Sequence, residues 1–337
     1  MKGQYLGHLS SGDPLYSYLR DHIAPQMGFD SPRPEFRVHQ FNNYRHVYLY
    51  EDEQGAFKVV GKFRPPDSKK NPHQARMAGE TEFGNLLFLR GLGLSALPHY
   101  VVRPLGFNPI LNNVLVVEYL EGETLSRIIA GAIHHGRRDR LFRKLSALAE
   151  FLSGLHNRTA GDWTVNFQES LEYLGRLIRT LIEKRGLGRV QSDEMYHLGE
   201  TWRGRGFMWE DRSVIVHGDA TPPNFLFGRD REVMAIDLER MKWADRVFDL
   251  GRVAGELKHY FYQATGDHLA AEPFIGHFLW EYCGRLPDQG AAFRSLTRRI
   301  PFYMGLNLLR IARNSWIDWE YRRRLIREAI QLLRVGT

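Results

Sequence analysis

Three polar side chains lie close together in the sequence VIVHGDATPPNFLFGRDREVMAIDLER, which covers residues 214–240. Asp219 follows a short apolar run, four residues separate it from Asn224, and Asp237 ends a third apolar run. Two prolines restrict the backbone of the loop between Asp219 and Asn224. Amide and carboxylate oxygens are ligands for Mg²⁺, so Asn224 and Asp237 suit a metal that also binds phosphate oxygens. Asp219 is then left to accept a proton from an attacking hydroxyl, as phosphoryl transfer requires.

The same three residues also have a structural interpretation. Aspartate and asparagine are common in turns, and an aspartate at the end of a strand can cap the chain there. The turn GRDRE between the second and third apolar runs predicts a β-hairpin that would bring Asp237 beside the loop. Because this hairpin and its acid accompany the loop, we favour the chemical interpretation.

The composition is that of a soluble globular protein. Of the 337 residues, 43% are hydrophobic and 25% are charged, and the chain is long enough for two lobes. No apolar run predicts a membrane span or a signal peptide, and the single cysteine, Cys283, excludes an internal disulfide. We therefore expect a cytoplasmic protein. The net charge of +7 fits an enzyme that handles phosphate at least as well as a nucleic-acid-binding protein, and we expect no nucleic-acid partner.

The elements that must position these residues change in type along the chain. An amphipathic segment at about 14–27 precedes three strands within residues 35–64, a helix at about 73–90, and strands in YVVRPLGF and NVLVVEYL. From Glu123 onward, apolar residues recur mostly at the spacing typical of helices. We therefore expect an α+β fold, with an N-terminal lobe over residues 1–120 and a helical C-terminal lobe over residues 121–337.

Two motifs, HGDATPPN and AIDLERMKWADRVFDLG, resemble those of the aminoglycoside phosphotransferase and choline/ethanolamine kinase superfamily. The resemblance covers nearly the whole chain and implies a two-lobed, protein-kinase-like fold. In such a fold, a small antiparallel β-sheet lobe with one helix binds the nucleotide, and a larger, mainly α-helical lobe follows it. The resemblance implies that Asp219 is the catalytic base and that Asn224 and Asp237 hold Mg²⁺. It also implies that Asp249 in FDLG braces the catalytic loop, and that ATP or GTP is the phosphate donor.

A kinase-like nucleotide lobe needs a strand lysine that reaches the phosphates and a helix glutamate that positions it. Lys62 lies late in the third strand, and Lys58, four residues earlier on the same face, is the alternative. On the helix, Glu82 has the spacing to two following leucines that would direct it inward, whereas Glu80 is the weaker candidate. The first turn of the sheet, FNNYRH, contains no glycine, unlike the glycine-rich loop of protein kinases.

The strand NVLVVEYL resembles the hinge that binds adenine in kinases. The resemblance implies that backbone groups of Glu118 and Leu120 bond to the adenine edge, with Val117 at the back of the pocket. A buried strand with an exposed end would have the same sequence pattern. The assignment of the hinge therefore depends on the resemblance.

These residues leave more than one function class open. A complete set of kinase-type residues favours an ATP- and Mg²⁺-dependent phosphotransferase that acts on a small-molecule hydroxyl. The set comprises Lys62, Glu82, Asp219, Asn224 and Asp237. The alternative is a catalytically silent nucleotide-binding protein, or pseudokinase, although such proteins usually lack one of these residues. A protein Ser/Thr kinase is disfavoured, because only 11 residues separate Asp237 from Asp249 and leave little chain for a substrate-binding loop.

The acceptor is less well defined by the sequence. In choline kinases, an acid at the position of Glu256 faces a quaternary ammonium inside a cage of aromatic rings. Met304 and Asn307 replace two tryptophans of that cage, and Trp319 and Tyr321 remain as candidate aromatic walls. The structural alternative is that Glu256 pairs with a basic neighbour on a helix.

Small-molecule acceptors of this kind include sugars, amino alcohols and lipid-linked sugars. Aminoglycosides are polycations that normally meet acidic pockets, and this chain is basic. We therefore expect a neutral or anionic hydroxyl compound rather than choline or an aminoglycoside.

Several other features favour structural interpretations. His134 and His135 are expected in an exposed loop rather than in a metal site, because no partner ligands have zinc spacing. The arginine-rich runs GRRDRLFRK and EYRRRLIRE are expected to form solvated helix faces, with contact to a membrane surface as the alternative. The pair Trp316 and Trp319 is expected to pack in the core.

Overall fold

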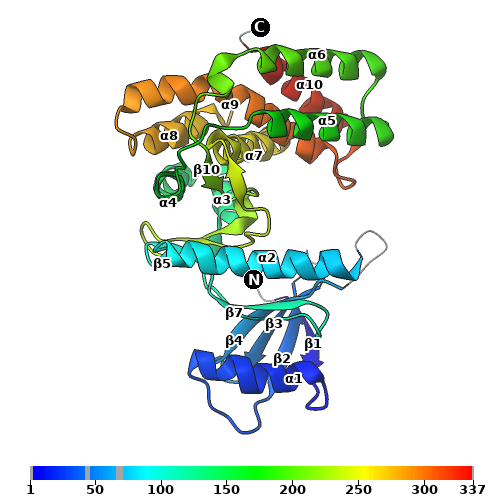
Figure 1. Ribbon diagram of the computed structural model, residues 1–337, viewed down its shortest axis with the longest axis vertical. Coiled ribbons are helices and arrows are strands. Elements are labelled where there is room, and N and C mark those ends of the chain that lie inside the picture. The colour runs from blue at the N-terminus through cyan, green and yellow to red at the C-terminus, as the bar shows by residue number, and fades with distance from the viewer. Residues whose placement is uncertain (1–2, 42–45, 66–70, 336–337) are drawn as a thin grey trace. The chain divides into compact units, whose positions relative to one another are not determined.

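The computed structural model describes residues 3–41, 46–65 and 71–335. The chain divides into two compact units, and the first combines Met1–Gly122 with the short segment Met234–Glu239. The second unit combines Glu123–Val233 with Arg240–Thr337. The first unit is built on an antiparallel sheet and the second is mainly helical (Figure 1), which confirms the expected α+β fold.

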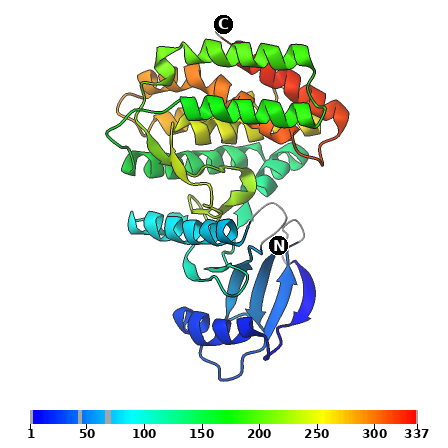
Figure 2. The same ribbon diagram turned by 45° about the vertical axis from the view of Figure 1, so that its right-hand side comes forward.

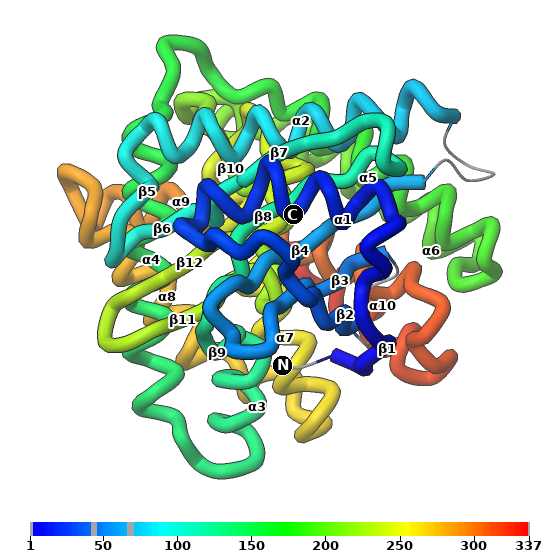
Figure 3. Tube along the Cα trace, turned by 90° about the horizontal axis from the view of Figure 1, so that it is seen from below, coloured from blue at the N-terminus to red at the C-terminus, as the bar shows by residue number. Residues whose placement is uncertain are grey.

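The sheet of the first unit is antiparallel and has the strand order β1-β2-β3-β4-β8-β7. Its strands are β1 (Gln4–His8), β2 (Phe36–Gln40), β3 (Val47–Asp52), β4 (Lys58–Lys62), β7 (Pro104–Asn108) and β8 (Val114–Glu118). Strands β2 to β4 are the three expected within residues 35–64, and they lie side by side in Figure 3. The edge strand β1 was not expected, and most of its side chains are exposed, so it has no alternating pattern to reveal it.

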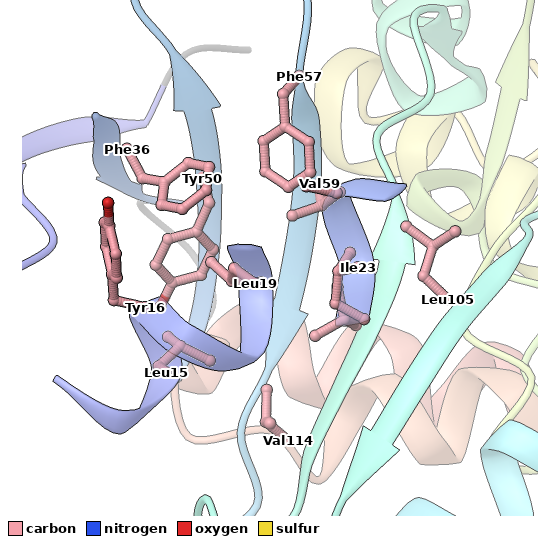
Figure 4. Close-up of a cluster of buried hydrophobic side chains, with 12 residues drawn as sticks. Leu15, Tyr16, Leu19, Ile23, Phe36, Tyr50, Phe57, Val59, Leu105 and Val114 are labelled. Carbon is pink, nitrogen blue, oxygen red and sulfur yellow. The ribbon is translucent and has the colours of Figure 1, made fainter. Parts of the chain in front are cut away.

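A helical segment covers one face of this sheet and forms a core with it. The segment consists of α1 (Pro14–Tyr18), a π-helical turn η1 (Leu19–Ile23) and a 3₁₀ turn η2 (Ala24–Met27). Its apolar side chains pack on alternate strand residues in a cluster that includes Leu19, Ile23, Phe36, Tyr50 and Val59 (Figure 4). Since strand residues alternate between faces, the side chain of Lys62 lies on the opposite face from Val59.

Helix α2 (Pro72–Gly91) packs in the same unit against β7 and β8. It begins at a capping box in which Asn71 and Gln74 bond to each other's backbone, and it buries Glu82 together with Leu86 and Leu89. After it, YVVRPLGF forms two strands rather than the single strand expected. The first is β6 (His99–Val101), which pairs with β5 (Ser95–Ala96), and β7 begins at Pro104, which lacks a backbone donor.

The second unit is a bundle of helices (Figure 2). The helices are α3 (Leu125–His135), α4 (Arg138–Arg158), α5 (Gln168–Glu183), α6 (Arg189–Arg203), α7 (Val247–Thr265), α8 (Glu272–Cys283), α9 (Gln289–Ala312) and α10 (Trp319–Arg334). Helix α7 is buried along most of its length and packs on α9, which packs in turn on α10. Gly255 makes a close α7–α9 crossing feasible, because a Cβ there would lie 2.9 Å from the Asn307 side chain.

Residues 214–240, which contain Asp219, Asn224 and Asp237, lie among short strands and turns between α6 and α7. They are a 3₁₀ turn η3 (Gly206–Met208), β10 (Val214–Val216), a 3₁₀ turn η4 (Pro222–Asn224), β11 (Phe225–Phe227), β12 (Val233–Ala235) and β13 (Lys242–Ala244). Strand β10 pairs with β13, and β11 pairs with β9 (Glu123–Thr124). Among the described residues, no helix is both long and apolar enough to cross a membrane.

Candidate active site

In the second unit, the buried carboxylate of Asp249 accepts hydrogen bonds from the backbone of the loop after β10. Asp249, near the start of α7, accepts the His217 N–H at 2.6 Å and the Gly218 N–H at 3.0 Å. Its Oδ2 also lies 3.3 Å from Nε2 of the buried His156. Burial alone would raise the pKa of Asp249, but His156 and His217 hold it below its ordinary value. An ionised Asp249 therefore fixes the backbone that leads into Asp219.

Gly218 lets this loop pass close to a neighbouring segment. Its φ is +78°, in the left-handed region, and a Cβ at this position would lie 1.8 Å from the Arg240 carbonyl oxygen. The approach follows from the pairing of β10 with β13, in which Val216 is opposite Lys242. Only glycine meets both the conformational and the steric condition. An arginine, which protein kinases usually carry here, could not replace it without a shift of the backbone.

Asn224 ends the 3₁₀ turn η4, which contains Pro222 and Pro223 at its start. The prolines fix φ through this turn. The Asn224 side-chain amide donates to the Asp219 carbonyl at 2.9 Å, and the side chain is 5% exposed. Because the amide nitrogen is used in this bond, the amide oxygen is the group that can serve as a metal ligand.

The carboxylate of Asp219 lies among arginines. Its Oδ1 accepts from Arg252 at 2.7 Å and from Arg310 at 2.9 Å, while an Arg240 nitrogen lies 3.9 Å from Oδ2. Burial alone would raise the pKa of Asp219, but Arg310, Arg252 and Arg240 hold it below its ordinary value. The side chain is therefore ionised at neutral pH and can accept a hydrogen bond from a hydroxyl.

In the first unit, Lys62 joins two carboxylates. Its ammonium donates to Glu82 at 2.7 Å and to Asp237 at 2.8 Å. Asp237, the second residue after β12, has a φ of +64°, and Asn85 of α2 donates to the neighbouring Leu238 carbonyl at 2.8 Å. Burial alone would lower the pKa of Lys62, but Glu82 and Asp237 raise it above its ordinary value. Lys62 thus stays charged. Helix α2 carries Glu82 and, through Asn85, also bonds to the residue that follows Asp237.

A second cation, Arg64, extends this cluster. One guanidinium nitrogen bonds to Glu82, and another donates to Glu239 at 2.9 Å. The carboxylates of Glu82, Asp237 and Glu239 offer ligand atoms that all lie within 4.8 Å of one another. The first unit therefore gathers three acids and two cations, a set of charges suited to phosphate and a divalent cation.

The alternative residues of the first unit lie elsewhere. Lys58 pairs with Glu121 at 3.3 Å, and Glu80 pairs with Arg76 on the outer face of α2. At the expected hinge, the Glu118 N–H donates to the Arg103 carbonyl at 3.0 Å, and the Glu118 side chain accepts from the Tyr100 hydroxyl at 2.6 Å. The backbone N–H of Glu118 is thus already hydrogen-bonded to Arg103. Leu120 follows the end of β8.

Glu256 lies one turn beyond Arg252 on α7 and is 6% exposed. Its Oε1 accepts from Arg310 at 3.2 Å and from the Asn307 amide at 3.2 Å. Burial raises the pKa of Glu256, and Arg310 only partly opposes this effect. Glu256 therefore pairs with a basic neighbour, as in the structural alternative, although that neighbour lies on α9 rather than on its own helix.

The two candidate aromatic walls have different environments. Tyr321 is buried, and its hydroxyl donates to the His259 carbonyl at 3.0 Å. Trp319 is 53% exposed and Trp316 is 66% exposed. The expectation that this tryptophan pair packs in the core is therefore wrong. The segment before α10 turns its rings outward, because α10 begins at Trp319 and Trp316 precedes it in the linking turn.

Each of the two expected metal ligands has a group of the kind that Mg²⁺ prefers. Asn224 of the second unit offers an amide oxygen, and Asp237 of the first unit offers a carboxylate. Metal-type groups of acids and histidines within the described residues are Glu82–Asp237–Glu239 and the exposed group His8, Glu35 and Glu53. Neither group includes His134 or His135, which end α3 beside the C-cap Gly136.

Reasoning from the sequence missed several residues of the site. They are Arg64, His156, Glu239, Arg252 and Arg310. Arg64 and Glu239 lie two residues after Lys62 and Asp237, so strand alternation offered a weak signal for Arg64. Arg252 and Glu256 have the four-residue spacing of one helix face, which was a signal as well. No local spacing singles out Arg310, because it lies 91 positions after Asp219 in the sequence.

Comparison with protein families places most of the chain in one of them. The model of the phosphotransferase enzyme family matches residues 39–293, which include both the cluster of Lys62, Glu82 and Asp237 and the Asp219 loop. Among curated proteins, none matches the sequence.

Solved structures with the same fold include kinases of small molecules. A choline kinase from Cryptosporidium parvum has a TM-score of 0.61 at 12% identity, covering 94% of each chain. An ethanolamine kinase from Plasmodium vivax has a TM-score of 0.59 at 14% identity, covering 94% of this chain and 86% of that one. An ADP-bound aminoglycoside phosphotransferase has a TM-score of 0.55 at 15% identity, covering 94% and 97%. At these identities the likeness shows a shared fold, which is the expected kinase-like one.

Proposed function

Because the chain belongs to the phosphotransferase enzyme family, and is thus a kinase-type enzyme that phosphorylates an alcohol group, we propose that it uses ATP and Mg²⁺ to phosphorylate a small molecule. The γ-phosphate would be transferred to a hydroxyl of a sugar, an amino alcohol or a lipid-linked sugar. GTP is the other candidate donor, since structural neighbours include GDP complexes.

The observation that carries this proposal is the bridge from Lys62 to Glu82 and Asp237. A lysine ammonium has three N–H donors, and Lys62 uses two of them on these acids at 2.7 and 2.8 Å. The third can donate to a phosphate oxygen of the nucleotide. Glu82 is 1% exposed, so it holds the lysine at a defined position. This arrangement supports the proposal that Lys62 binds the nucleotide phosphates and that Glu82 positions it.

The remaining residues fit the other roles in phosphoryl transfer. Asn224 and Asp237 would hold Mg²⁺, which neutralises charge on the phosphate oxygens when bound. The Glu118 carbonyl and the backbone of Leu120 would bond to the adenine edge. Asp219 would orient the acceptor hydroxyl and take its proton, on a loop that Asp249 fixes. A low pKa at Asp219 is compatible with this role, because phosphoryl transfer depends mainly on positioning and charge stabilisation.

ATP consumption tests the proposal. The purified protein would be incubated with Mg-ATP and pools of metabolites, and in parallel with generic protein substrates, while ADP release is measured. We expect ADP release that depends on a metabolite pool and is lost in Asp219→Asn. Nucleotide binding without turnover in any pool would instead support the catalytically silent alternative. Turnover that depends on protein substrates would support a protein kinase.

A further inference from the structure

The side chains around Asp219 contain more positive charge than its own carboxylate requires. Arg252 and Arg310 both donate to Oδ1, at 2.7 and 2.9 Å, and Arg240 lies 3.9 Å from Oδ2. One or two of these contacts would keep the base ionised. A catalytic base that must still receive a hydroxyl does not need two guanidinium groups on the same oxygen, so their position calls for another explanation.

The charge balance of the cluster depends on Glu256. Arg252 and Arg310 contribute two positive charges, and Asp219 and Glu256 contribute at most two negative ones. Burial raises the pKa of Glu256, and protonation of this carboxylate leaves one positive charge in excess. Burial and the neighbouring Arg252 also lower the pKa of Arg310, as expected where a cation lies beside another cation.

Positive charge continues outward from this cluster along β13. The Lys242 ammonium lies 4.6 Å from the centre of the Phe248 ring, and the Arg252 guanidinium lies 5.0 Å from the centre of the same ring. Burial, Arg252 and Arg176 together lower the pKa of Lys242, although Glu169 lies 3.9 Å away. An anion near Asp219 would therefore lie close to the arginines that bond to Asp219 and would also be attracted by Lys242.

Arg310 also has a donor that the described protein groups leave unused. Its two terminal nitrogens bond to Asp219 and Glu256, whereas its buried Nε has no hydrogen-bond partner among the described residues. A buried N–H without a partner is destabilising, and more so in a charged group. The neighbouring Asn307, which is 2% exposed, likewise has an unpaired amide oxygen. The Arg310 side chain keeps 17% exposure, so a ligand can reach it.

We infer that the acceptor carries an oxyanion, a carboxylate or a phosphate, beside the hydroxyl that is phosphorylated, and that Arg310 and Arg252 bind this oxyanion. The inference rests on the proposed function and specifies its substrate class. In the reaction, the acceptor oxygen bonds to the γ-phosphorus, the bond from that phosphorus to the β–γ bridging oxygen breaks, the hydroxyl proton passes to Asp219, and ADP leaves.

The position of Glu256 supports an anion over a cation. An acid that recognises an ammonium group must keep its oxygens available to that group. Glu256 instead accepts from Arg310 and from Asn307, each at 3.2 Å. A cationic acceptor would have to displace one cation and approach two more.

Binding of inorganic sulfate tests the inference without turnover. Titration calorimetry would be carried out with a saturating non-hydrolysable Mg-ATP analogue, which occupies the nucleotide-phosphate site. We expect Arg310→Gln to weaken sulfate binding at least about fivefold, whereas Glu256→Gln leaves it unchanged or tightens it, because a competing carboxylate is removed. Arg189→Gln is the matched control, since Arg189 is 94% exposed on α6 and its loss changes the net charge equally. Equal sulfate affinity in wild type and Arg310→Gln would overturn the inference while leaving the proposed function intact.

A turnover experiment identifies the substrate class directly. Aqueous and organic metabolite extracts would each be separated by ion exchange into cationic, neutral and anionic fractions and incubated with γ-labelled ATP. We expect label transfer into the anionic fraction, and the extract that supports it tells a soluble acceptor from a lipid-linked one. Labelling confined to a neutral or cationic fraction would overturn the inference. Absence of labelling in every fraction would contradict the proposed function, whereas the sulfate titration would still decide the anion site.

Discussion

Asp249 accepts the backbone N–H of Gly218 at 3.0 Å, directly beneath the peptide that leads to the Asp219 side chain. The same carboxylate accepts the His217 N–H at 2.6 Å and is completely buried. The two N–H groups bond to different oxygens of the carboxylate, and an asparagine would replace one of these oxygens with an NH₂ group, which donates instead of accepting. The geometry of the loop that carries Asp219 therefore depends on a charge in the core of the second unit.

We predict that Asp249→Asn lowers both stability and turnover. The amide would leave one buried N–H without an acceptor, so the free energy of unfolding should fall by about 1–3 kcal/mol. At a temperature where the variant is fully folded, kcat should still fall at least about tenfold, because Asp219 loses its fixed position. Urea unfolding and steady-state kinetics check the two effects. Asp193→Asn, on the exposed face of α6, is the control, and kcat within twofold of wild type would refute a positioning role.

Asp219→Asn should separate the chemical step from nucleotide binding. Removal of a general base typically costs about 10²–10⁴-fold in rate, so kcat should fall at least about 10²-fold. The affinity for Mg-ATP should stay within a few-fold of wild type, since the hydrogen-bond donors to the Asp219 carboxylate are Arg252 and Arg310 of the second unit. Kinetics and calorimetry measure these two quantities. Turnover near the wild-type rate would show that another group acts as the base.

Substitutions of Lys62 and Asp237 should affect nucleotide binding in different ways. Asp237→Ala should weaken the dependence of nucleotide binding on Mg²⁺, because Mg²⁺ uses few protein ligands. Lys62→Ala should weaken ATP binding about tenfold or more through loss of a charge-assisted bond, yet spare adenosine binding. Thermal-shift titrations with ATP, Mg-ATP and adenosine distinguish the two. The same Mg-ATP stabilisation in wild type and Asp237→Ala would remove Asp237 from the metal site.

His259 should make the protein less stable as the pH falls. Burial, together with Arg310, lowers the pKa of His259 to about 4, whereas the unfolded residue has its ordinary value near 6.5. The unfolded state therefore binds the proton first, and stability present above about pH 6.5 is lost progressively toward pH 4. Between pH 7 and pH 5, wild type should lose about 2 kcal/mol more than His259→Gln. Parallel losses in urea unfolding would show that His259 is not held neutral in the fold.

Much of the fold could be predicted from local patterns. The strands around Lys62 and the helix that carries Glu82 follow from alternating and helical spacings, and both side chains meet as strand alternation requires. The edge strand β1 and the strand β13 were missed, since short strands with exposed or mixed residues have no distinctive period. The outward rings of Trp316 and Trp319 were missed for a related reason, because ring size alone does not tell which side of a turn faces the core.

The charges of the site were less predictable than its motif. Asp219, Asn224 and Asp237 stand out because loop and strand order place them in a recognisable spacing. Arg310 of α9 bonds to Asp219 of the loop after β10, and α9 crosses α7 closely at Gly255, packing relations that no local window of the sequence contains. With 46 lysines and arginines in the chain, composition could not indicate which of them pair with the site acids.

The identity of the phosphorylated product tests the central claim most directly. Wild-type protein would be incubated with γ-labelled ATP, Mg²⁺ and the active metabolite fraction, and the product would be analysed by mass spectrometry and phosphorus NMR. We predict a phosphate monoester on a carbon-bound oxygen of a small molecule, formed together with one equivalent of ADP and absent with Asp219→Asn. Release of ADP and inorganic phosphate alone, with no ester in any fraction, would contradict the account.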